Sequence, residues 1–328
     1  MISCKCTRRA VTAFAAALAT GASIGAAAQD FPSRPIEIVV PYPPGGTVET
    51  IARIIADRMA KSFSQPVLVV MRPGAAGNIG SLSVAKAPPN GYTLVLGTQS
   101  SHGTNNVLFK NMPYDPVRDF AAISNLASSP LILVVNPKLP ATSVDELVVH
   151  ARKQSGGLNY ASTSVGGLAH LAGEMFKRAT GLDLTHVPYK GSGPARTDLL
   201  GGHVFMMFDN IASSLPAAQA GQLRALAVTG EKRTPAAPQL ATMIELGYKD
   251  FVAEGWYGLF APAGTPADVI AKLHGEIVRI LKTPEVVDRF RVLGLDIIGN
   301  TPAEFAAQVK IDMVRLGKVI TDAGIKPE

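Results

Sequence analysis

The stretch from Ile36 to Lys61 reads IEIVVPYPPGGTVETIARIIADRMAK. Its first five residues predict a buried strand that stops at Pro41, and a helix is expected over residues 47–61, where apolar residues recur at helical spacing. Further strands are expected at 67–71 and 92–96, with a helix between them. This βαβαβ order predicts a mainly parallel sheet with helices on its faces.

The rest of the chain continues the alternation of short apolar strands and amphipathic helices. Further strands are expected at 131–135, 158–161, 185–188, 204–208, 223–229 and 256–261. Helices are expected at 143–154, 170–180, 267–281, 284–293 and 302–323. No segment has the composition of a flexible linker, so we expect two α/β lobes joined by crossing strands. Ligands of such open sheets bind beyond the carboxyl ends of the strands.

The N-terminus has the order of residues that marks an export signal. The cations Lys5, Arg8 and Arg9 precede an apolar run over residues 10–24, and small residues follow as far as Ala28. The run is too short to span a bilayer, although a membrane anchor is the alternative interpretation. We therefore expect residues 1–28 to be a signal peptide that is cleaved near Ala28.

Length and composition narrow the functional classes. The 328 residues are 47% hydrophobic and 17% charged, which suits a globular chain of about two domains. Without the expected signal the formal charge falls from +6 to +3, and aromatic residues make up only 6% of the chain. A nucleic-acid partner is therefore not expected. Both cysteines, Cys4 and Cys6, lie in the signal, which leaves the mature chain without disulfide or thiolate chemistry.

Four loops after expected strands hold candidate binding groups, at residues 41–47, 72–80, 98–102 and 162–167. Their glycines allow backbone N–H groups to approach a ligand, and the N-terminus of a following helix favours negative charge. Serine and threonine hydroxyls add the donors of a carboxylate cradle. Each loop taken alone is also consistent with a rigid connection or a helix cap. The recurrence of the pattern favours a binding site for an anionic small molecule.

Motifs for catalysis or metal binding are missing from the expected mature chain. The only G-x-S-x-G lies at residues 21–25, within the signal, and the glycines of residues 74–80 do not have dinucleotide-loop spacing. His170 and Glu174 share a helix face, but two possible ligands are a weak metal signal. We expect no enzymatic activity, no cofactor and no metal site.

Several motifs together resemble a known family. They are Val40–Gly46, Arg72–Gly74 with Gly77–Gly80, Pro89–Thr93, His186–Gly191, Asp198–Gly202, Leu223–Thr229, and Trp256 with Gly258–Leu259 and Ala261–Pro266. In this order and spacing the chain resembles the Bug family, the TctC-type periplasmic solute-binding proteins of tripartite tricarboxylate transporters. The resemblance covers essentially the whole mature chain.

The resemblance implies a periplasmic-binding-protein (Venus-flytrap) fold of the α/β class, with mainly parallel sheets flanked by helices. It implies lobe 1 at residues 29–130 plus 251–328 and lobe 2 at residues 131–250. A periplasmic monomer would capture a small organic carboxylate and deliver it to the membrane subunits of a transporter. The ligand-binding residues implied or nearby are Tyr42, Gly45, Gly46, Thr47, Ser100, Ser101, Ser162, Ser164, Gly166, Gly167, His170, Tyr189, Lys190 and Asp209.

The chain departs from the usual family pattern at three places. Glu49 stands where aspartate is common, Val70-Met71 replaces an acidic-amide pair, and Ala76 replaces glycine. A Glu49 carboxylate pointing inward would change the pocket and reject some diacids. The alternatives to a transport receptor are an exported α/β enzyme such as a hydrolase, or a receptor subunit that senses its ligand. The identity of the carboxylate stays open.

Overall fold

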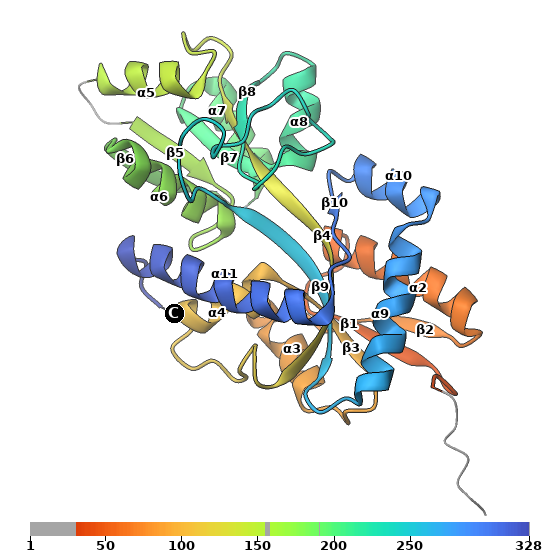
Figure 1. Ribbon diagram of the computed structural model, residues 1–328. Coiled ribbons are helices and arrows are strands. Elements are labelled where there is room, and N and C mark those ends of the chain that lie inside the picture. Colours follow the sequence, from red (N-terminus) through yellow and green to blue (C-terminus); the bar gives the residue numbers. More distant parts are fainter. Residues whose placement is uncertain (1–30, 155–157, 190, 328) are drawn as a thin grey trace, which may run out of the picture. The chain divides into compact units, whose positions relative to one another are not determined.

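The structure is a computed structural model that describes residues 31–154, 158–189 and 191–327 (Figure 1). The expected signal over residues 1–28 and the candidate residue Lys190 lie outside the described residues. Arg34–Glu328 form one compact unit. Within the described ranges, no helix combines the length and apolarity that crossing a bilayer requires.

Strands and helices alternate along the described chain. The strands are β1 (Ile36–Val40), β2 (Val67–Met71), β3 (Thr93–Thr98), β4 (Phe120–Val135), β5 (Leu158–Ser162), β6 (Leu184–Pro188), β7 (Met206–Asn210), β8 (Arg224–Val228), β9 (Glu254–Pro262) and β10 (Asp296–Ile297). The helices are α2 (Thr47–Phe63), α3 (Asn78–Ala85), α4 (Asn105–Leu108), α5 (Val144–Arg152), α6 (Leu168–Thr180), α7 (Ser192–Gly201), α8 (Ile211–Gln219), α9 (Ala267–Leu281), α10 (Pro284–Val292) and α11 (Pro302–Asp322). Two short helical turns are η1 (Ala75–Gly77) and η2 (Ser100–Thr104).

The strands form a mixed sheet in the order β2-β1-β3-β9-β4-β7-β5-β6, with β8 and β10 paired to β4. The long strand β4 changes partners along its length (Figure 1). Up to Pro130 it pairs with β9, and from Leu131 it pairs with β7 and β8. We call β1, β2, β3, β9 and β10 the first strand group and β5 to β8 the second strand group. The strand β4 belongs to both.

Helices pack on these strands in a way that the side-chain alternation explains. In the second strand group, Leu133 of β4 lies in a core with α5 and α6, whereas Ile132 and Val134 lie in a core with α7 and α8. Successive side chains of a strand point to opposite faces, so this part of the sheet is covered on both sides. In the first strand group, α3 and α11 pack around Trp256 and Phe305.

The structure departs from the sequence-based expectation in its strand pairing. The pairs among β1, β2 and β3 and among β5, β6 and β7 are parallel, but β3 with β9 and every pairing of β4 are antiparallel. The sheet is therefore more mixed than expected. Strand β4 begins at Phe120, whereas the sequence predicts a strand only from Leu131. The first half of β4 was missed because it is rich in small and polar residues, and it is held in the sheet by pairing with the distant strand β9.

Candidate functional site

Hydroxyl side chains gather where β1 and β3 end. Tyr42 follows β1, and its hydroxyl oxygen lies 2.6 Å from Oγ1 of Thr98, the last residue of β3. The Thr98 N–H donates to Ser101 Oγ at 3.0 Å. A Cβ added at Gly77, where φ is +95°, would lie 3.1 Å from the Tyr42 hydroxyl, so glycine keeps this space open. Parallel strands end at one edge of a sheet, which is where α/β folds bind ligands.

Tyr257 joins this cluster from β9, where it pairs with Thr98. Burial raises the pKa of Tyr257 to about 12; Tyr42 acts in the same direction, and a hydrogen bond with the Thr47 side chain acts against it. Tyr42, Thr47, Thr98 and Tyr257 therefore form one group, which we call the hydroxyl cluster. The sequence pattern does not predict Tyr257 as a site residue, because only the antiparallel pairing of β3 with β9 brings it there.

In the loop between β1 and α2, one of the backbone donors expected to face a ligand is bound within the protein. The Gly45 N–H donates to Glu49 Oε2 at 2.6 Å, and Arg53 Nε donates to Glu49 Oε1 at 2.7 Å. The bond from Gly45, followed by that from Arg53, lowers the pKa of Glu49, which favours the ionised carboxylate. The Gly45 N–H that we expected to face a ligand thus binds the protein's own carboxylate. The left-handed backbone also lies at Gly45, with φ +90°, and not at Gly46, with φ −92°.

Buried hydrogen bonds hold the loop between β5 and α6. The Ser162 hydroxyl donates to the Ser164 carbonyl at 2.9 Å, and Ser162 Oγ lies 2.6 Å from His186 Nε2. The Gly166 N–H donates to His170 Nδ1 at 2.9 Å. The rings of His170 and His186 stack with their centroids 3.7 Å apart. Two stacked imidazoles therefore fix the loop, one near its start and one near its end.

The environment of these imidazoles keeps them neutral. Burial lowers the pKa of both His170 and His186 to about 4; at His186 the His170 ring contributes to this lowering, and Glu174 acts against it. A protonated imidazole has no acceptor nitrogen, so the bond from Gly166 to His170 requires the neutral form. Tyr160 donates its hydroxyl to Glu174 Oε1 at 2.6 Å, and that oxygen lies 4.0 Å from His170 Nε2.

The helix that follows this loop has an N-terminus suited to an anion. Its N-cap, Gly167, makes no side-chain capping bond, and the first turn of α6 holds no acidic residue. The first turn of α2, by contrast, holds Glu49. First-turn N–H groups lack partners within a helix and carry partial positive charge. Of the two loops, the one preceding α6 is therefore better able to accept a ligand carboxylate.

Contacts between the two strand groups bring the loop between β5 and α6, which we call the α6 loop, towards the hydroxyl cluster. A Cβ added at Gly166 would lie 3.0 Å from Leu108 of α4, and one added at Gly255 of β9 would lie 3.6 Å from Leu168. Gly255 and Tyr257 point to the same side of β9, because side chains alternate along a strand. The α6 loop and the hydroxyl cluster thus approach one face of β9, and together they form the candidate site.

Three predicted ligand residues are fully buried and are bound within the protein. These are Ser101, Ser162 and Asp209. Asp209 accepts hydrogen bonds from Ser192 at 2.5 Å and from Ser214 at 2.6 Å. The side-chain oxygens of all three residues therefore already have hydrogen-bond partners within the protein. Burial of this kind depends on the tertiary contacts and leaves no mark in the loop sequence.

The remaining predicted residues have different surroundings. Ser164 is exposed and Ser100 is half-buried, so both keep accessible hydroxyl-bearing side chains. Tyr189 donates its hydroxyl to Asp198 at 2.6 Å, within its own strand group. Lys190 lies outside the described residues.

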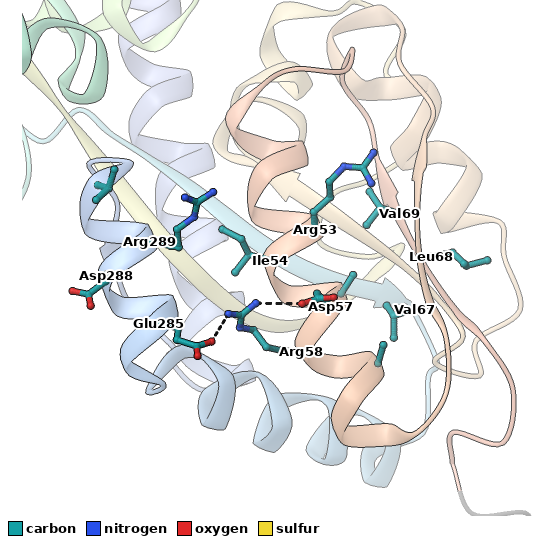
Figure 2. Close-up of a pocket in the computed structure, with 13 residues that line it drawn as sticks. Arg53, Ile54, Asp57, Arg58, Val67, Leu68, Val69, Glu285, Asp288 and Arg289 are labelled. Atoms are coloured by element: carbon teal, nitrogen blue, oxygen red, sulfur yellow. Dashed lines mark hydrogen bonds and ion pairs between the residues drawn. The ribbon is translucent and has the colours of Figure 1, made fainter.

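A pocket of about 1000 Å³ lies elsewhere, between α2, β2 and α10 (Figure 2). Arg58 approaches Glu285 at 2.7 Å and Asp57 at 3.5 Å there. Arg53, which also lines the pocket, pairs with Glu49 outside it. The residues that line it include no serine, threonine or tyrosine. It therefore lacks the hydroxyl donors of the candidate site, and we do not assign the ligand to it.

Comparison with solved structures defines the class of protein to which this fold and site belong. An R. palustris protein solved with adipate is 37% identical, with a TM-score of 0.76 over 91% of this chain and 100% of that chain. MatC from Rhodopseudomonas palustris, solved with malate, is 32% identical, with a TM-score of 0.71 over 88% and 100%. The α/β fold is that of the periplasmic binding proteins, as expected.

Sequence relatives identify the family. Protein BugT of Bordetella pertussis is 36% identical over 307 residues, which are 93% of this chain and 94% of BugT. Residues 51–325 match the tripartite tricarboxylate transporter family receptor, TctC. The chain belongs to this family of periplasmic solute-binding receptors. Its members are binding proteins and not enzymes, which confirms the expected function class and removes the hydrolase alternative.

Proposed function

We propose that this chain captures a small organic carboxylate between its two strand groups and delivers it to the membrane subunits of a tripartite tricarboxylate-type transporter. The observation that carries the proposal is the approach of the uncapped α6 loop and the hydroxyl cluster to one face of β9. The carboxylate ligands of the two R. palustris neighbours, adipate and malate, support the ligand class.

In the proposed complex the ligand carboxylate lies at the N-terminus of α6. First-turn N–H groups and the exposed Ser164 side chain would donate to it, and hydrogen bonds to a charged acceptor are roughly twice as strong as neutral ones. Tyr42, Thr47 and Tyr257 would hold the other end of the ligand, directly or through ordered water. These three side chains offer neutral hydroxyl donors to that end of the ligand. The nearby Glu49 is anionic and would repel a second carboxylate there.

We propose that the strand groups act as lobes, with lobe 1 at residues 29–130 plus 251–328 and lobe 2 at residues 131–250. The change of β4 partners between Pro130 and Leu131 supports this division. A ligand that contacts both lobes only when they are closed shifts the equilibrium towards closure. Binding would then present a closed receptor to the transporter.

The proposal includes export as a monomer after cleavage near Ala28. N-terminal sequencing of protein from the periplasm should begin at Gln29 or within a few residues, and light scattering should give the mass of one chain. An uncleaved product or a stable dimer would contradict these two points without affecting the ligand proposal.

A thermal-shift screen of organic acids, including adipate, malate, amino acids and aromatic acids, tests the ligand class. A bound ligand stabilises the fold by RT ln(1 + [L]/Kd), which is about 2.7 kcal/mol at a hundredfold excess over Kd. Tyr257→Phe should weaken the best ligand, while Tyr248→Phe, which alters a tyrosine packed against the core of the second strand group, should not. Absence of stabilisation by every acid would overturn the proposed function.

A further inference from the structure

A second cavity, of about 610 Å³, lies against β4, β9 and α11. Its lining includes Asn125 of β4 and both Glu254 and Trp256 of β9. Glu254 and Trp256 alternate along β9 with Gly255 and Tyr257, which face the candidate carboxylate site. The cavity therefore lies on the opposite face of β9, and the proposed ligand site does not account for it.

Negative charge dominates this cavity. The carboxylate residues in its lining are Glu231, Asp250, Glu254, Glu304 and Asp312, and Arg315 is the one cation among the lining residues described. Arg315 is already paired with Asp312 at 2.7 Å and donates to the Val252 carbonyl at 2.6 Å. The chain as a whole carries a formal charge of +6, so this acidic surface does not simply follow from composition.

The groups that change the pKa of Glu254 include no cation. Burial raises the pKa of Glu254; the charges of Asp296 and Glu231 act in the same direction, and hydrogen bonds from the Ser128 hydroxyl and the Glu231 backbone act against them. A carboxyl group whose pKa is raised by burial and by like charges is stabilised in its ionised form when a cation binds beside it. The cavity therefore provides a position at which a positive ligand would be favoured.

A separate observation also favours a ligand that donates hydrogen bonds. Asn125 is 1% exposed, and its Oδ1 has no hydrogen-bond partner, while its Nδ2 donates to Gln308 at 3.2 Å. A buried acceptor without a donor costs about 1–3 kcal/mol. A donor that enters beside Asn125 would remove this cost, which a cation without N–H groups cannot do.

The wall between the charged groups is partly apolar. Ile298 and Ile311 line the cavity and are 43% and 64% exposed. Methylene groups of a ligand would cover these side chains. The residues described contain no group of three or more His, Cys, Asp or Glu side chains that would hold a metal ion. The lining thus suits charged amino groups separated by methylenes better than a metal ion.

We propose that this cavity binds a small aliphatic di- or polyamine, whose ammonium groups pair with Glu254, Asp250 and Glu231 and donate to Asn125. The site is independent of the proposed carboxylate site. A bound amine would contact α11, both crossing strands and the segment that follows β8.

Trp256 is the only tryptophan in the chain and it lines the cavity, so its fluorescence reports on this site. The mature protein is titrated with 1,4-diaminobutane and with spermidine at low salt, and a thermal shift is recorded in parallel. Tetramethylammonium, which has a positive charge but no N–H, and magnesium are titrated at matched ionic strength. We expect a saturable change in emission and an increase in melting temperature with the amines only.

Two conservative variants locate the binding. Glu254→Gln and Asp250→Asn should each weaken the diamine about tenfold or more, equivalent to ~1.4 kcal/mol. Asparagine tolerates the left-handed backbone of Asp250, where φ is +60°. Asp288→Asn on α10 is the matched control and should leave the affinity unchanged. A linear response, an equal response to tetramethylammonium or magnesium, or unchanged affinity in both variants would overturn the proposal.

Discussion

The imidazole rings of His170 and His186 are parallel to within 9°, with centroids 3.7 Å apart, and each forms a hydrogen bond to the loop that precedes α6. Each ring must be neutral for this arrangement, because two stacked cations would repel and His170 Nδ1 would no longer accept the Gly166 N–H. The stability of the protein should therefore depend on pH through this pair.

We expect the free energy of unfolding to decrease as pH falls from about 6.5 to about 4. The folded-state pKa of each ring, about 4, lies below the unfolded value of 6.5, so in this window the unfolded chain binds protons that the folded chain does not. At about 1.4 kcal/mol per pKa unit, the loss should be on the order of 3 kcal/mol for each ring. Urea unfolding at several pH values measures it.

The variant His170→Asn should reduce this pH dependence, since Asn Oδ1 still accepts the Gly166 N–H and does not titrate. His150→Asn on α5 is the control. The same slope in His170→Asn and in the wild type would show that the stacked pair does not determine the pH dependence.

Glu49 should discriminate against ligands that carry a second carboxylate. The anionic Glu49 stands at the N-terminus of α2, beside the hydroxyl cluster that we assign to the far end of the ligand. Glu49→Gln should raise the affinity for adipate relative to hexanoate about tenfold or more, or ~1.4 kcal/mol, in calorimetric titrations. Glu146→Gln is a matched control, because Glu146 likewise accepts the N–H of the residue four positions earlier, Thr142, at 2.7 Å. An unchanged ratio in Glu49→Gln would refute the assignment.

The two glycines of the β1–α2 loop should respond differently to substitution. A Cβ at Gly46 has the Pro43 carbonyl oxygen as its nearest neighbour, at 4.0 Å, and φ is −92°, so Gly46→Val should fold. Its branched side chain should lower ligand affinity at least about tenfold, or ~1.4 kcal/mol, by calorimetry. Gly45→Val instead meets φ +90° and should lose about 1–3 kcal/mol of stability. Equal ligand affinity in Gly46→Val and wild type would mean that the loop is only a connection.

The serines of the α6 loop should separate stability from binding. Ser162→Ala removes buried hydrogen bonds to the Ser164 carbonyl and to His186, so we expect denaturant unfolding to show a loss of about 1–3 kcal/mol. Ser164→Ala alters an exposed side chain and should leave the melting temperature nearly unchanged while weakening ligand binding. If Ser164→Ala lowers stability and leaves affinity unchanged, its hydroxyl is a structural group.

Local interactions were sufficient to predict most helices and many strand positions. Ser143 accepts the Glu146 N–H at the start of α5, and Gly181 ends α6 in the left-handed conformation, as their residue types indicate. Helices α7 and α8 are absent from the prediction, because their apolar residues lack a clear helical period.

The sequence by itself determined which loops follow parallel strands, and with them the regions of Tyr42 and of residues 162–167 that form the candidate site. Runs of neighbouring residues are enough for that, because strand periodicity and turn residues act over short separations. The ligand class that we propose rests on the same loops, since glycines and hydroxyls provide the donors that bind an anion.

Only the tertiary structure decided which polar groups are still accessible. Ser162 is bound to His186, 24 residues away, and Tyr257 reaches the hydroxyl cluster through pairing with Thr98. Whether a hydroxyl faces a ligand or a buried neighbour depends on such distant partners, which the order of residues in a loop does not encode. The acidic cavity beside Trp256 arises in the same way, because its carboxylates come from segments that meet only when β4, β9 and α11 pack together.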